Sequence, residues 1–278
     1  MTEYLRPSSV EEALAFRAAH PDYTILAGGT DLLVGSKNGK RPVGVIDIFG
    51  LDALNGVSEE DGFVVIGAAT TYREILASDL VAERLPMLSA AVREIGAVQI
   101  QARGTIGGNM GTSSPVGDTL PVLLAADARV VLGSKRGRRE VSYDEYCTGY
   151  RQTALAKDEL IIAIRFPGLP AGTQQFWRKM GTRKAQSISK TMVAMTARVE
   201  AGTIAAIRIG VGAVAVTPIR ARAAEAAALG QPANQATADA VRDALIAEIQ
   251  PIDDLRSTAS YRANAAGNVV RRFLSTLS

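Results

Sequence analysis

The sequence predicts an α+β protein built in two parts. Short β-branched and apolar runs alternate with capped helices over about the first 168 residues. A breaker cluster, Pro167-Gly168-Leu169-Pro170, follows them. Beyond it, three strand patterns in succession precede three helix patterns. A chain of 278 residues also exceeds what one hydrophobic core usually serves. We therefore expect a first domain over residues 1–170, with subdomains of about 1–55 and 56–168, and a C-terminal domain over residues 172–278.

The first subdomain reads as a small β-α-β unit. Ser9-Val10-Glu11-Glu12 fits a capping box, in which the serine hydroxyl accepts an N–H three residues on and the glutamate reaches back. A strand is predicted over Tyr23 to Ala27, and Gly28-Gly29-Thr30-Asp31 ends it. A helical turn follows at Leu32-Leu33-Val34, and the next strand covers Val43 to Ile48.

The second subdomain mixes strands and helices around a long irregular stretch. Thr71-Tyr72-Arg73-Glu74 is another capping box. Residues 96 to 121 are crowded with Gly, Ser, Thr and Pro and are predicted to be loop-rich. The run Lys135 to Arg139 reads as a solvated hairpin tip. The predicted strands are Phe63 to Ala68, Arg129 to Leu132 and Leu160 to Phe166, and a helix is predicted from about Met87 to Ile95.

The C-terminal domain is predicted to be a three-stranded antiparallel sheet with helices on one face. A turn at Ala201-Gly202 joins the second and third strands. The predicted strands are Phe176 to Met180, Met192 to Glu200 and Ile204 to Val214, and the predicted helices are Ile219 to Leu229, Ala236 to Ile249 and Thr258 to Leu277.

Composition excludes several classes of protein. A net charge of +3 without a basic stripe does not favour nucleic-acid binding. No apolar run reaches the roughly 18 residues that span a bilayer, and the N-terminus lacks a secretory pattern, so a cytoplasmic protein is expected. One cysteine, Cys147, and one histidine, His20, cannot hold an iron–sulfur cluster or the usual zinc site. Metal ligands are therefore not predicted, and any redox cofactor should be organic.

The first candidate site is Ala27-Gly28-Gly29-Thr30-Asp31-Leu32, which lies between a predicted strand and a helix start. Consecutive glycines let the backbone approach a ligand closely, and exposed N–H groups at a helix start stabilise an anion such as a pyrophosphate. Taken alone, the same pattern also fits a turn that is merely tight.

The second candidate site runs from Gly104-Thr105-Ile106-Gly107-Gly108-Asn109 to Ser114-Pro115-Val116-Gly117-Asp118. A phosphate and a hydroxyl-rich ligand would pair its backbone donors, and Asp118 would accept hydrogen bonds from ligand hydroxyls. The alternative is a flexible surface loop. Neither glycine segment has the spacing of a Rossmann or Walker loop, and two separate segments suggest a ligand clamped between subdomains.

These motifs resemble the FAD-binding medium subunits of the xanthine dehydrogenase and carbon monoxide dehydrogenase family of molybdenum hydroxylases. The resemblance rests on Leu26-Ala27-Gly28-Gly29-Thr30-Asp31-Leu32, on Thr105-Ile106-Gly107-Gly108-Asn109, and on Ser114-Pro115-Val116-Gly117-Asp118. Asp158-Glu159-Leu160-Ile161, Phe176-Trp177-Arg178-Lys179 and the segment Asp254 to Arg262 extend it over essentially the whole chain.

The resemblance implies a vanillyl-alcohol-oxidase/PCMH-like FAD domain of two subdomains with the cofactor between them. The backbone of Ala27 to Leu32 and of Thr105 to Asn109 would hold the pyrophosphate, and Asp118 would bind sugar or ribityl hydroxyls. Ile95 and Ile161 would line the flavin ring, with Lys179 nearby. Binding should be noncovalent, because His20 and Cys147 lie outside the motifs; His20 reads as a surface turn residue, and Cys147 and Trp177 read as packing residues.

The implied function is electron transfer within a multi-subunit enzyme. Molybdopterin and [2Fe-2S] clusters would lie on a large subunit and an iron–sulfur subunit, and FAD would pass electrons to NAD⁺ or another acceptor. The residue pattern of the C-terminal part of the sequence most resembles that of xanthine-type dehydrogenases. Two alternatives remain open, which are a free-standing FAD-dependent oxidoreductase and a non-enzymatic nucleotide-binding module. A free-standing enzyme needs an acid or base over the flavin, and the sequence offers no evident candidate.

Overall fold

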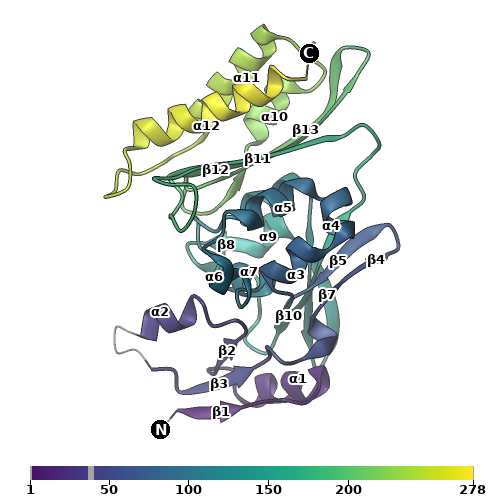
Figure 1. Cartoon of the computed structure of the whole chain (residues 1–278), viewed down its shortest axis with the longest axis vertical. Helices are drawn as coiled ribbons and strands as arrows, with labels where there is room; N and C mark the ends of the chain where they lie inside the picture. Colours follow the sequence, from purple (N-terminus) through teal and green to yellow (C-terminus); the bar gives the residue numbers. More distant parts are fainter. Residues whose placement is uncertain (1, 37–40, 278) are drawn as a thin grey trace.

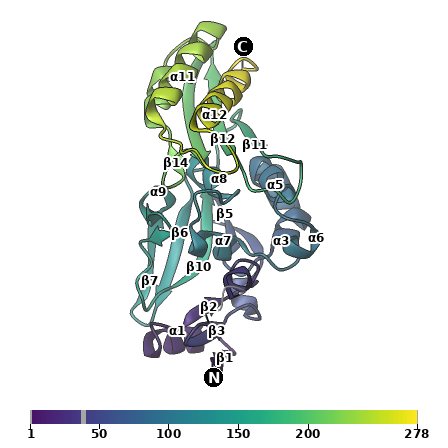
Figure 2. The same cartoon turned by 90° about the vertical axis from the view of Figure 1, so that its left-hand side faces the viewer.

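The computed structural model describes residues 2–36 and 41–277 and stacks three units along its long axis (Figures 1 and 2). A small unit with the N-terminus lies at one end, a larger mixed unit in the middle, and a sheet covered by helices at the other end (Figure 1). This arrangement confirms the predicted α+β class.

The N-terminal unit is the predicted β-α-β arrangement. Its strands run parallel in the order β1-β3-β2, and Ile46 and Leu54 are fully buried in its core. Its elements are β1 (Glu3–Leu5), α1 (Val10–Ala19), β2 (Thr24–Leu26), α2 (Leu32–Ser36), β3 (Gly44–Asp47) and the 3₁₀ turn η1 (Asp52–Leu54).

Both predicted capping residues begin helices, but the two boxes differ. At the start of α3 (Tyr72–Ala77), Thr71 and Glu74 exchange both hydrogen bonds of the box. At the start of α1, Ser9 accepts the N–H of Glu12 as predicted. The Glu12 carboxylate, however, accepts the N–H of Ser8 at 2.6 Å rather than that of Ser9. The predicted hydrogen bond from the N–H of Ser9 to the Glu12 side chain is therefore wrong. The Glu12 carboxylate instead binds Ser8, whose hydroxyl also donates to it at 2.7 Å.

The middle unit is a five-stranded antiparallel sheet in the order β4-β5-β10-β6-β7, with helices against it. The strands predicted near residues 63, 129 and 160 are confirmed, and the basic hairpin tip lies between β6 and β7. The strands of this sheet are β4 (Val57–Glu60), β5 (Phe63–Gly67), β6 (Arg129–Ser134), β7 (Gly137–Ser142) and β10 (Leu160–Pro167). Two short strands, β8 (Cys147–Gly149) and β9 (Gln152–Thr153), pair with each other separately. The helices after α3 are α4 (Asp79–Arg84), α5 (Pro86–Arg93), α6 (Val98–Gln101), α7 (Ile106–Thr112), α8 (Leu120–Ala125) and α9 (Tyr143–Tyr146).

The prediction of a loop-rich stretch over residues 96 to 121 is wrong, because α6, α7 and the start of α8 lie there. Helix α7 contains three glycines, which disfavour helix by roughly 1 kcal/mol each relative to alanine. Its Thr105 cap and the packing of buried Ile106 and Met110 override that preference. Every residue of α8 is buried, so tertiary packing again outweighs local signals.

The C-terminal unit contains the three predicted strands, β11 (Gln174–Met180), β12 (Thr191–Glu200) and β13 (Thr203–Gly212), paired antiparallel. A two-residue strand, β14 (Ile219–Arg220), extends the edge, so the helix predicted from Ile219 begins at Arg222 instead. Ala201 and Gly202 both adopt positive φ in the predicted turn. The helices are α10 (Arg222–Ala228), α11 (Gln235–Glu248) and α12 (Ala259–Leu274).

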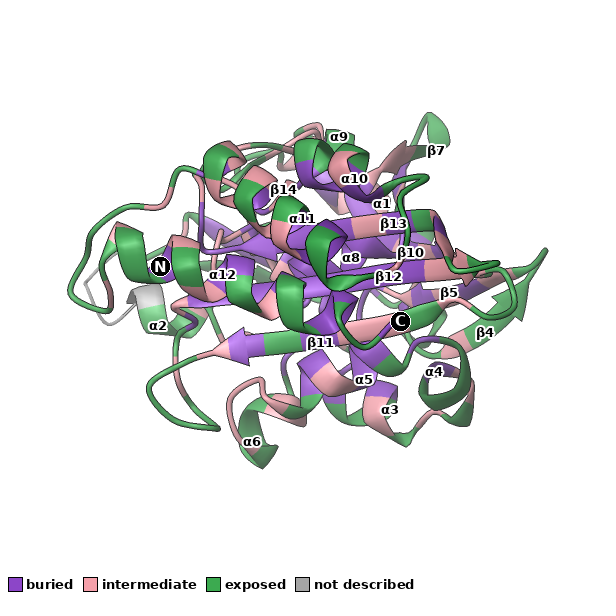
Figure 3. Ribbon diagram, turned by 90° about the horizontal axis from the view of Figure 1, so that it is seen from above, coloured by how far each residue is buried: buried purple, intermediate pink, exposed green. Residues whose placement is uncertain are grey.

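The C-terminal sheet is buried on both faces (Figure 3). Helices α10, α11 and α12 cover one face as predicted (Figures 1 and 3). Helix α8 of the middle unit packs against the other face, in one cluster with Trp177 and Ala194. A Cβ on Gly210 would lie 2.1 Å from the carbonyl oxygen of Pro121, and the Thr196 hydroxyl donates to the carbonyl of Ala125 at 3.1 Å. Among the helices of the described ranges, none has the length and apolar character needed to cross a bilayer.

Candidate functional site

A cavity of about 590 Å³ lies between the N-terminal unit and the middle unit. That volume falls within the range of about 300–1,000 Å³ typical of small-molecule and cofactor sites. Most of the predicted binding residues line it: Leu26, Ala27, Gly28, Gly29, Thr30, Asp31, Leu32, Thr105, Gly107, Gly108, Asn109, Ser114, Gly117 and Ile161. The two glycine segments thus meet at one site, although they are far apart in the sequence.

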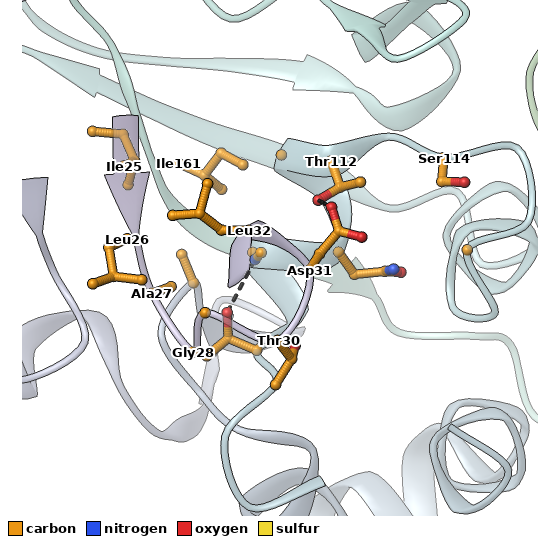
Figure 4. Close-up of a pocket in the computed structure, with 18 of the residues that line it drawn as sticks. Ile25, Leu26, Ala27, Gly28, Thr30, Asp31, Leu32, Thr112, Ser114 and Ile161 are labelled. Atoms are coloured by element: carbon orange, nitrogen blue, oxygen red, sulfur yellow. Dashed lines mark hydrogen bonds between the residues drawn. The ribbon is translucent and has the colours of Figure 1, made fainter. Parts of the chain in front are cut away.

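Close backbone contact holds the two glycine segments together. A Cβ on Gly28 would lie 1.7 Å from the carbonyl oxygen of Arg103 and 3.1 Å from Cα of Gly104, so only glycine fits there. The hydroxyl of Thr112 donates to a carboxylate oxygen of Asp31 at 3.2 Å, as Figure 4 shows. A side-chain contact therefore joins the first segment to the end of α7.

The first glycine segment presents a row of backbone donors. Between the end of β2 and the start of α2, the N–H groups of Gly28, Gly29, Thr30 and Asp31 have no hydrogen-bond acceptor in the described chain. Gly29 has φ +76°, a left-handed conformation that suits glycine. Consecutive unpaired N–H groups at a turn attract an anionic ligand. This segment has the chemistry needed to hold a phosphate group.

The second glycine segment uses its backbone donors within the protein. The N–H groups of residues 106 to 109 all have acceptors within the protein, because they bond to Thr70, Ala68 and Thr105 at 3.0–3.2 Å. These four amides are already used by α7, by the Thr105 cap and by the carbonyl groups of Ala68 and Thr70, so their part in holding a ligand stays a prediction. The glycines make a side-chain-free wall on which a ligand can lie.

Polar side chains of the second segment face the cavity. Thr119, which is fully buried, donates its hydroxyl to Oδ1 of Asn109 at 2.6 Å. This bond fixes the orientation of the Asn109 amide and leaves Nδ2 without an acceptor in the described chain. Ser114 adds a hydroxyl to the lining. Together with the first segment, these groups make one side of the cavity a hydrogen-bonding surface.

The other side of the cavity is apolar. Figure 4 shows Ile25, Leu32 and Ile161 gathered on one side. Several lining residues were not anticipated from the sequence, because they come from elements distant in the chain: Tyr72, Arg151, Leu155, Leu160 and Ile188. Ile188 belongs to the C-terminal unit, and its loop, rich in serine and basic residues, carries no sequence signal for a binding site. An apolar surface beside a row of donors suits a ligand with a flat ring system and a phosphate.

Five predicted site residues lie outside the cavity lining. Gly104 supports the contact with Gly28, Ile106 is buried in the core, and Ile95 packs half-buried against that core. Asp118 and Lys179 form an ion pair, with Nζ of Lys179 2.6 Å from Oδ2 of Asp118. Burial raises the pKa of Asp118, while Lys179 and Ser189 oppose that rise.

The residues capable of acid–base or covalent chemistry lie mostly away from the cavity. His20 ends α1 and stacks on Tyr23, and Cys147 is half-buried with its sulfur 3.2 Å from the Ser113 hydroxyl. Trp177 is buried and packs as predicted. Tyr72 lines the cavity, but burial raises its pKa far above neutrality. Within the described ranges, His, Cys, Asp and Glu side chains form no cluster that could hold a metal.

Comparisons with known proteins match both parts of the chain. The family model "FAD binding domain in molybdopterin dehydrogenase" covers residues 1–169, and the model "CO dehydrogenase flavoprotein C-terminal domain" covers residues 176–277. The carbon monoxide dehydrogenase medium chain of Hydrogenophaga pseudoflava is 35% identical over 98% of this chain and 95% of that protein. The xanthine dehydrogenase FAD-binding subunit of Escherichia coli O157:H7 is 30% identical over 98% of this chain and 94% of that subunit.

Solved structures show the same fold. A chain of the carbon monoxide dehydrogenase from Hydrogenophaga pseudoflava has a TM-score of 0.94 at 37% identity, covering 98% of this chain and 95% of that one. A chain of the reconstituted CO dehydrogenase from Oligotropha carboxidovorans also has a TM-score of 0.94, at 30% identity, covering 98% of this chain and 96% of that one.

Proposed function

Since this chain belongs to the family of FAD-binding flavoprotein subunits of molybdenum hydroxylases, we propose that it binds FAD noncovalently in the cavity between its first two units and relays electrons within a larger enzyme. In this proposal residues 1–55 and 56–168 enclose the cofactor, and residues 172–278 form the C-terminal domain. Noncovalent binding is supported by a lining that, over the described residues, contains neither histidine nor cysteine.

One observation carries the placement of the cofactor: Gly28 to Asp31 line the cavity, and their four consecutive N–H groups have no acceptor among the described residues. Four adjacent donors fit the charge of a diphosphate. The Asn109 amide and the hydroxyls of Thr30 and Ser114 fit the sugar and ribityl hydroxyls of FAD. The apolar wall at Ile161 fits a flavin ring. The flavin itself supplies the ability to take up two electrons and release them.

The electrons would come from partner subunits. The single cysteine of this chain cannot hold an iron–sulfur cluster, which takes about four thiolates. We propose that an iron–sulfur subunit delivers electrons and that a large molybdopterin subunit oxidises the substrate, as the name of the matching family model supports. A xanthine dehydrogenase-like assembly with NAD⁺ as acceptor is the proposed form, supported by the relative from Escherichia coli.

The proposal is tested first on the purified chain. We expect a yellow protein that releases FAD on denaturation and binds it again after its removal. Gly28→Ala should abolish this binding, because its Cβ would collide with the Arg103 carbonyl and separate the two segments. Gly50→Ala is the matched control, since only the mobile end of the Arg6 side chain lies near its Cβ, at 3.2 Å. A colourless protein that does not take up FAD would overturn the proposal.

The electron relay is tested on the assembled enzyme. Substrate should reduce the bound FAD only after the iron–sulfur and molybdopterin subunits have been added. Xanthine, carbon monoxide and nicotine, compared as substrates with NAD⁺ as acceptor, separate the proposed xanthine-type enzyme from relatives with other substrates. Reduction by substrate without the partner subunits would instead support a free-standing FAD-dependent oxidoreductase.

A further inference from the structure

The capping box of α3 holds a tyrosine at the wall of the cavity. Thr71 caps the helix and exchanges both hydrogen bonds of the box with Glu74. Tyr72 is the first residue of the helix, and its N–H donates to the carbonyl oxygen of Gly104 at 3.0 Å. Thr71 also pairs with Thr105 in an antiparallel bridge. The backbone of Tyr72 is therefore fixed beside the second glycine segment.

The ring of Tyr72 packs closely against the same segment. A Cβ on Gly104 would lie 2.8 Å from Cε2 of Tyr72 and 3.1 Å from its Cδ2. Tyr72 belongs to the core of the middle unit, is 4% exposed, and lines the cavity. Because both the backbone and the ring are held, the protein sets the position of this side chain before a ligand enters.

The hydroxyl of Tyr72 has no hydrogen-bond partner among the described residues. Most buried hydroxyl groups in proteins are hydrogen-bonded, because an unpaired one costs free energy, and phenylalanine would fill the same space without that cost. The Asp118 carboxylate is not the partner, since its two oxygens accept from Lys179 and Ser189. The cavity is the remaining place where this hydroxyl can find an acceptor.

Tyr72 differs from the two other tyrosines buried in the described chain. Tyr143 and Tyr146 also have hydroxyls without a partner, but those oxygens are enclosed by the core, and neither residue lines the cavity. Burial raises the pKa of Tyr72 well above its usual value, and the charge of Asp118 raises it further. The phenol therefore stays neutral at physiological pH and is a constant hydrogen-bond donor.

We propose that Tyr72 is a cofactor-binding residue whose hydroxyl donates a hydrogen bond to an oxygen or a ring nitrogen of FAD. This inference deepens the proposed function and rests on it, because it takes FAD as the ligand. A donor that is already fixed adds affinity without the entropic cost of ordering a flexible side chain. A hydrogen bond to the flavin ring would also favour the reduced flavin, since the ring gains negative charge on reduction.

The experiment uses the full-length chain loaded with FAD and, separately, freed of it. Tyr72→Phe removes the hydroxyl and keeps the ring. Tyr143→Phe is the matched control, because it removes an unpaired hydroxyl from the same core at a position that does not line the cavity. We measure the dissociation constant of FAD, the visible absorption and midpoint potential of the bound flavin, and the thermal unfolding of each cofactor-free protein.

We expect Tyr72→Phe to raise the dissociation constant about fivefold, the effect of losing one neutral hydrogen bond. The cofactor-free variant should be at least as stable as the wild type, because the hydroxyl has no partner within the protein to lose. Tyr143→Phe should bind FAD like the wild type. A shifted absorption and a lower midpoint potential in Tyr72→Phe would place the acceptor on the flavin ring, whereas weaker binding alone would place it on the ribityl chain or the diphosphate.

The inference is overturned if Tyr72→Phe keeps the wild-type affinity and flavin spectrum, or if Tyr143→Phe weakens binding equally. A cofactor-free Tyr72→Phe protein that unfolds at a clearly lower temperature would also contradict it, because the hydroxyl would then have a structural role. A wild-type chain that binds no FAD refutes the proposed function itself and is thus a distinct result.

Discussion

At the scale of single residues, the pair of Arg139 and Glu159 holds one side of the middle sheet. The Glu159 carboxylate, 5% exposed, accepts from two nitrogens of Arg139 at 2.7 and 2.8 Å and from the N–H of Ala156 at 2.8 Å. Arg139 lowers the pKa of Glu159 below its usual value, and the Ala156 N–H adds to the effect. The pair joins β7 to the residue before β10, whose Leu160 and Ile161 line the cavity.

This pair predicts a pH dependence of stability. A carboxyl whose folded pKa lies below its unfolded value of about 4.3 adds stability above that value and loses it as the pH falls through the folded pKa. At neutral pH, Glu159→Gln should lower the free energy of unfolding by about 1–3 kcal/mol. The difference from wild type should shrink below about pH 4.3, as measured by urea unfolding.

A control residue is available for the pH experiment. Glu83 is largely exposed, and its contact with Arg84 is 3.9 Å long, so Glu83→Gln should change stability little at any pH. A loss in Glu159→Gln that stays constant down to strongly acidic pH would contradict an electrostatic role for the pair.

At the scale of elements, the glycines of α7 have unequal roles. A Cβ on Gly107 would lie 2.5 Å from the carbonyl oxygen of Ala68 and 2.8 Å from its Cβ. Gly107 does not have positive φ, so an unusual backbone conformation is not the reason for a glycine there. The reason is the close packing of α7 against the end of β5, which leaves no room for a side chain. Gly111 is different, because the nearest atom to its Cβ is Cδ1 of Ile161 at 3.8 Å, an ordinary contact.

The two positions give opposite predictions. Gly107→Ala should destabilise the protein by about 1–3 kcal/mol, the usual effect of overpacking, and should weaken FAD binding by displacing α7. Gly111→Ala should leave stability unchanged or raise it by up to about 1 kcal/mol, because alanine favours helix. Thermal unfolding of the cofactor-free proteins measures both. Equal stability of the two variants would show that α7 is not held against Ala68 as described.

The elements that the sequence predicted are those with strong local signals. The Thr71 box, the apolar strands β5 and β10 and the turn at Ala201-Gly202 carry their information in a few adjacent residues. Helices α6 and α7 carry no such signal, because α6 is four residues long and α7 is rich in glycine. Their stability comes from partners such as Ala68, which is far away in the sequence.

The same distinction applies to the cavity. Both glycine segments were recognisable, because their composition is unusual by itself. Ile188 and Tyr72 were not, since their part in the lining depends on how distant elements meet. Lys179 was named as a site residue, but its pairing with Asp118 was not predicted, because the two lie 61 positions apart. Ser189, 71 positions from Asp118, was missed altogether.

At the scale of the whole molecule, the hydrophobic core of the middle unit extends past the breaker at Pro167. Buried Trp177 and Ala194 of the C-terminal unit belong to the same cluster as α8. The C-terminal sheet in turn buries β12 and β13 between α8 and its own helices. The two halves of the chain therefore share packing surfaces, although a short exposed linker joins them.

A split chain tests this dependence. A fragment of residues 1–170, produced alone, would expose α8 and lose Ile188 and the partners of Asp118. We therefore expect it to aggregate, or to unfold at a much lower temperature than the full chain. We also expect it to retain little FAD. The same fragment co-produced with residues 171–278 should reassemble and recover FAD, because the shared surfaces are largely apolar. A full-length chain cleaved at an inserted protease site beside Gly172 is the control, since nothing lies within 4 Å of a Cβ at that position. Flavin absorbance, size-exclusion chromatography and thermal unfolding compare the fragment alone, the co-produced fragments and the cleaved chain. A monomeric 1–170 fragment with wild-type FAD affinity would show that the C-terminal unit does not support the cavity.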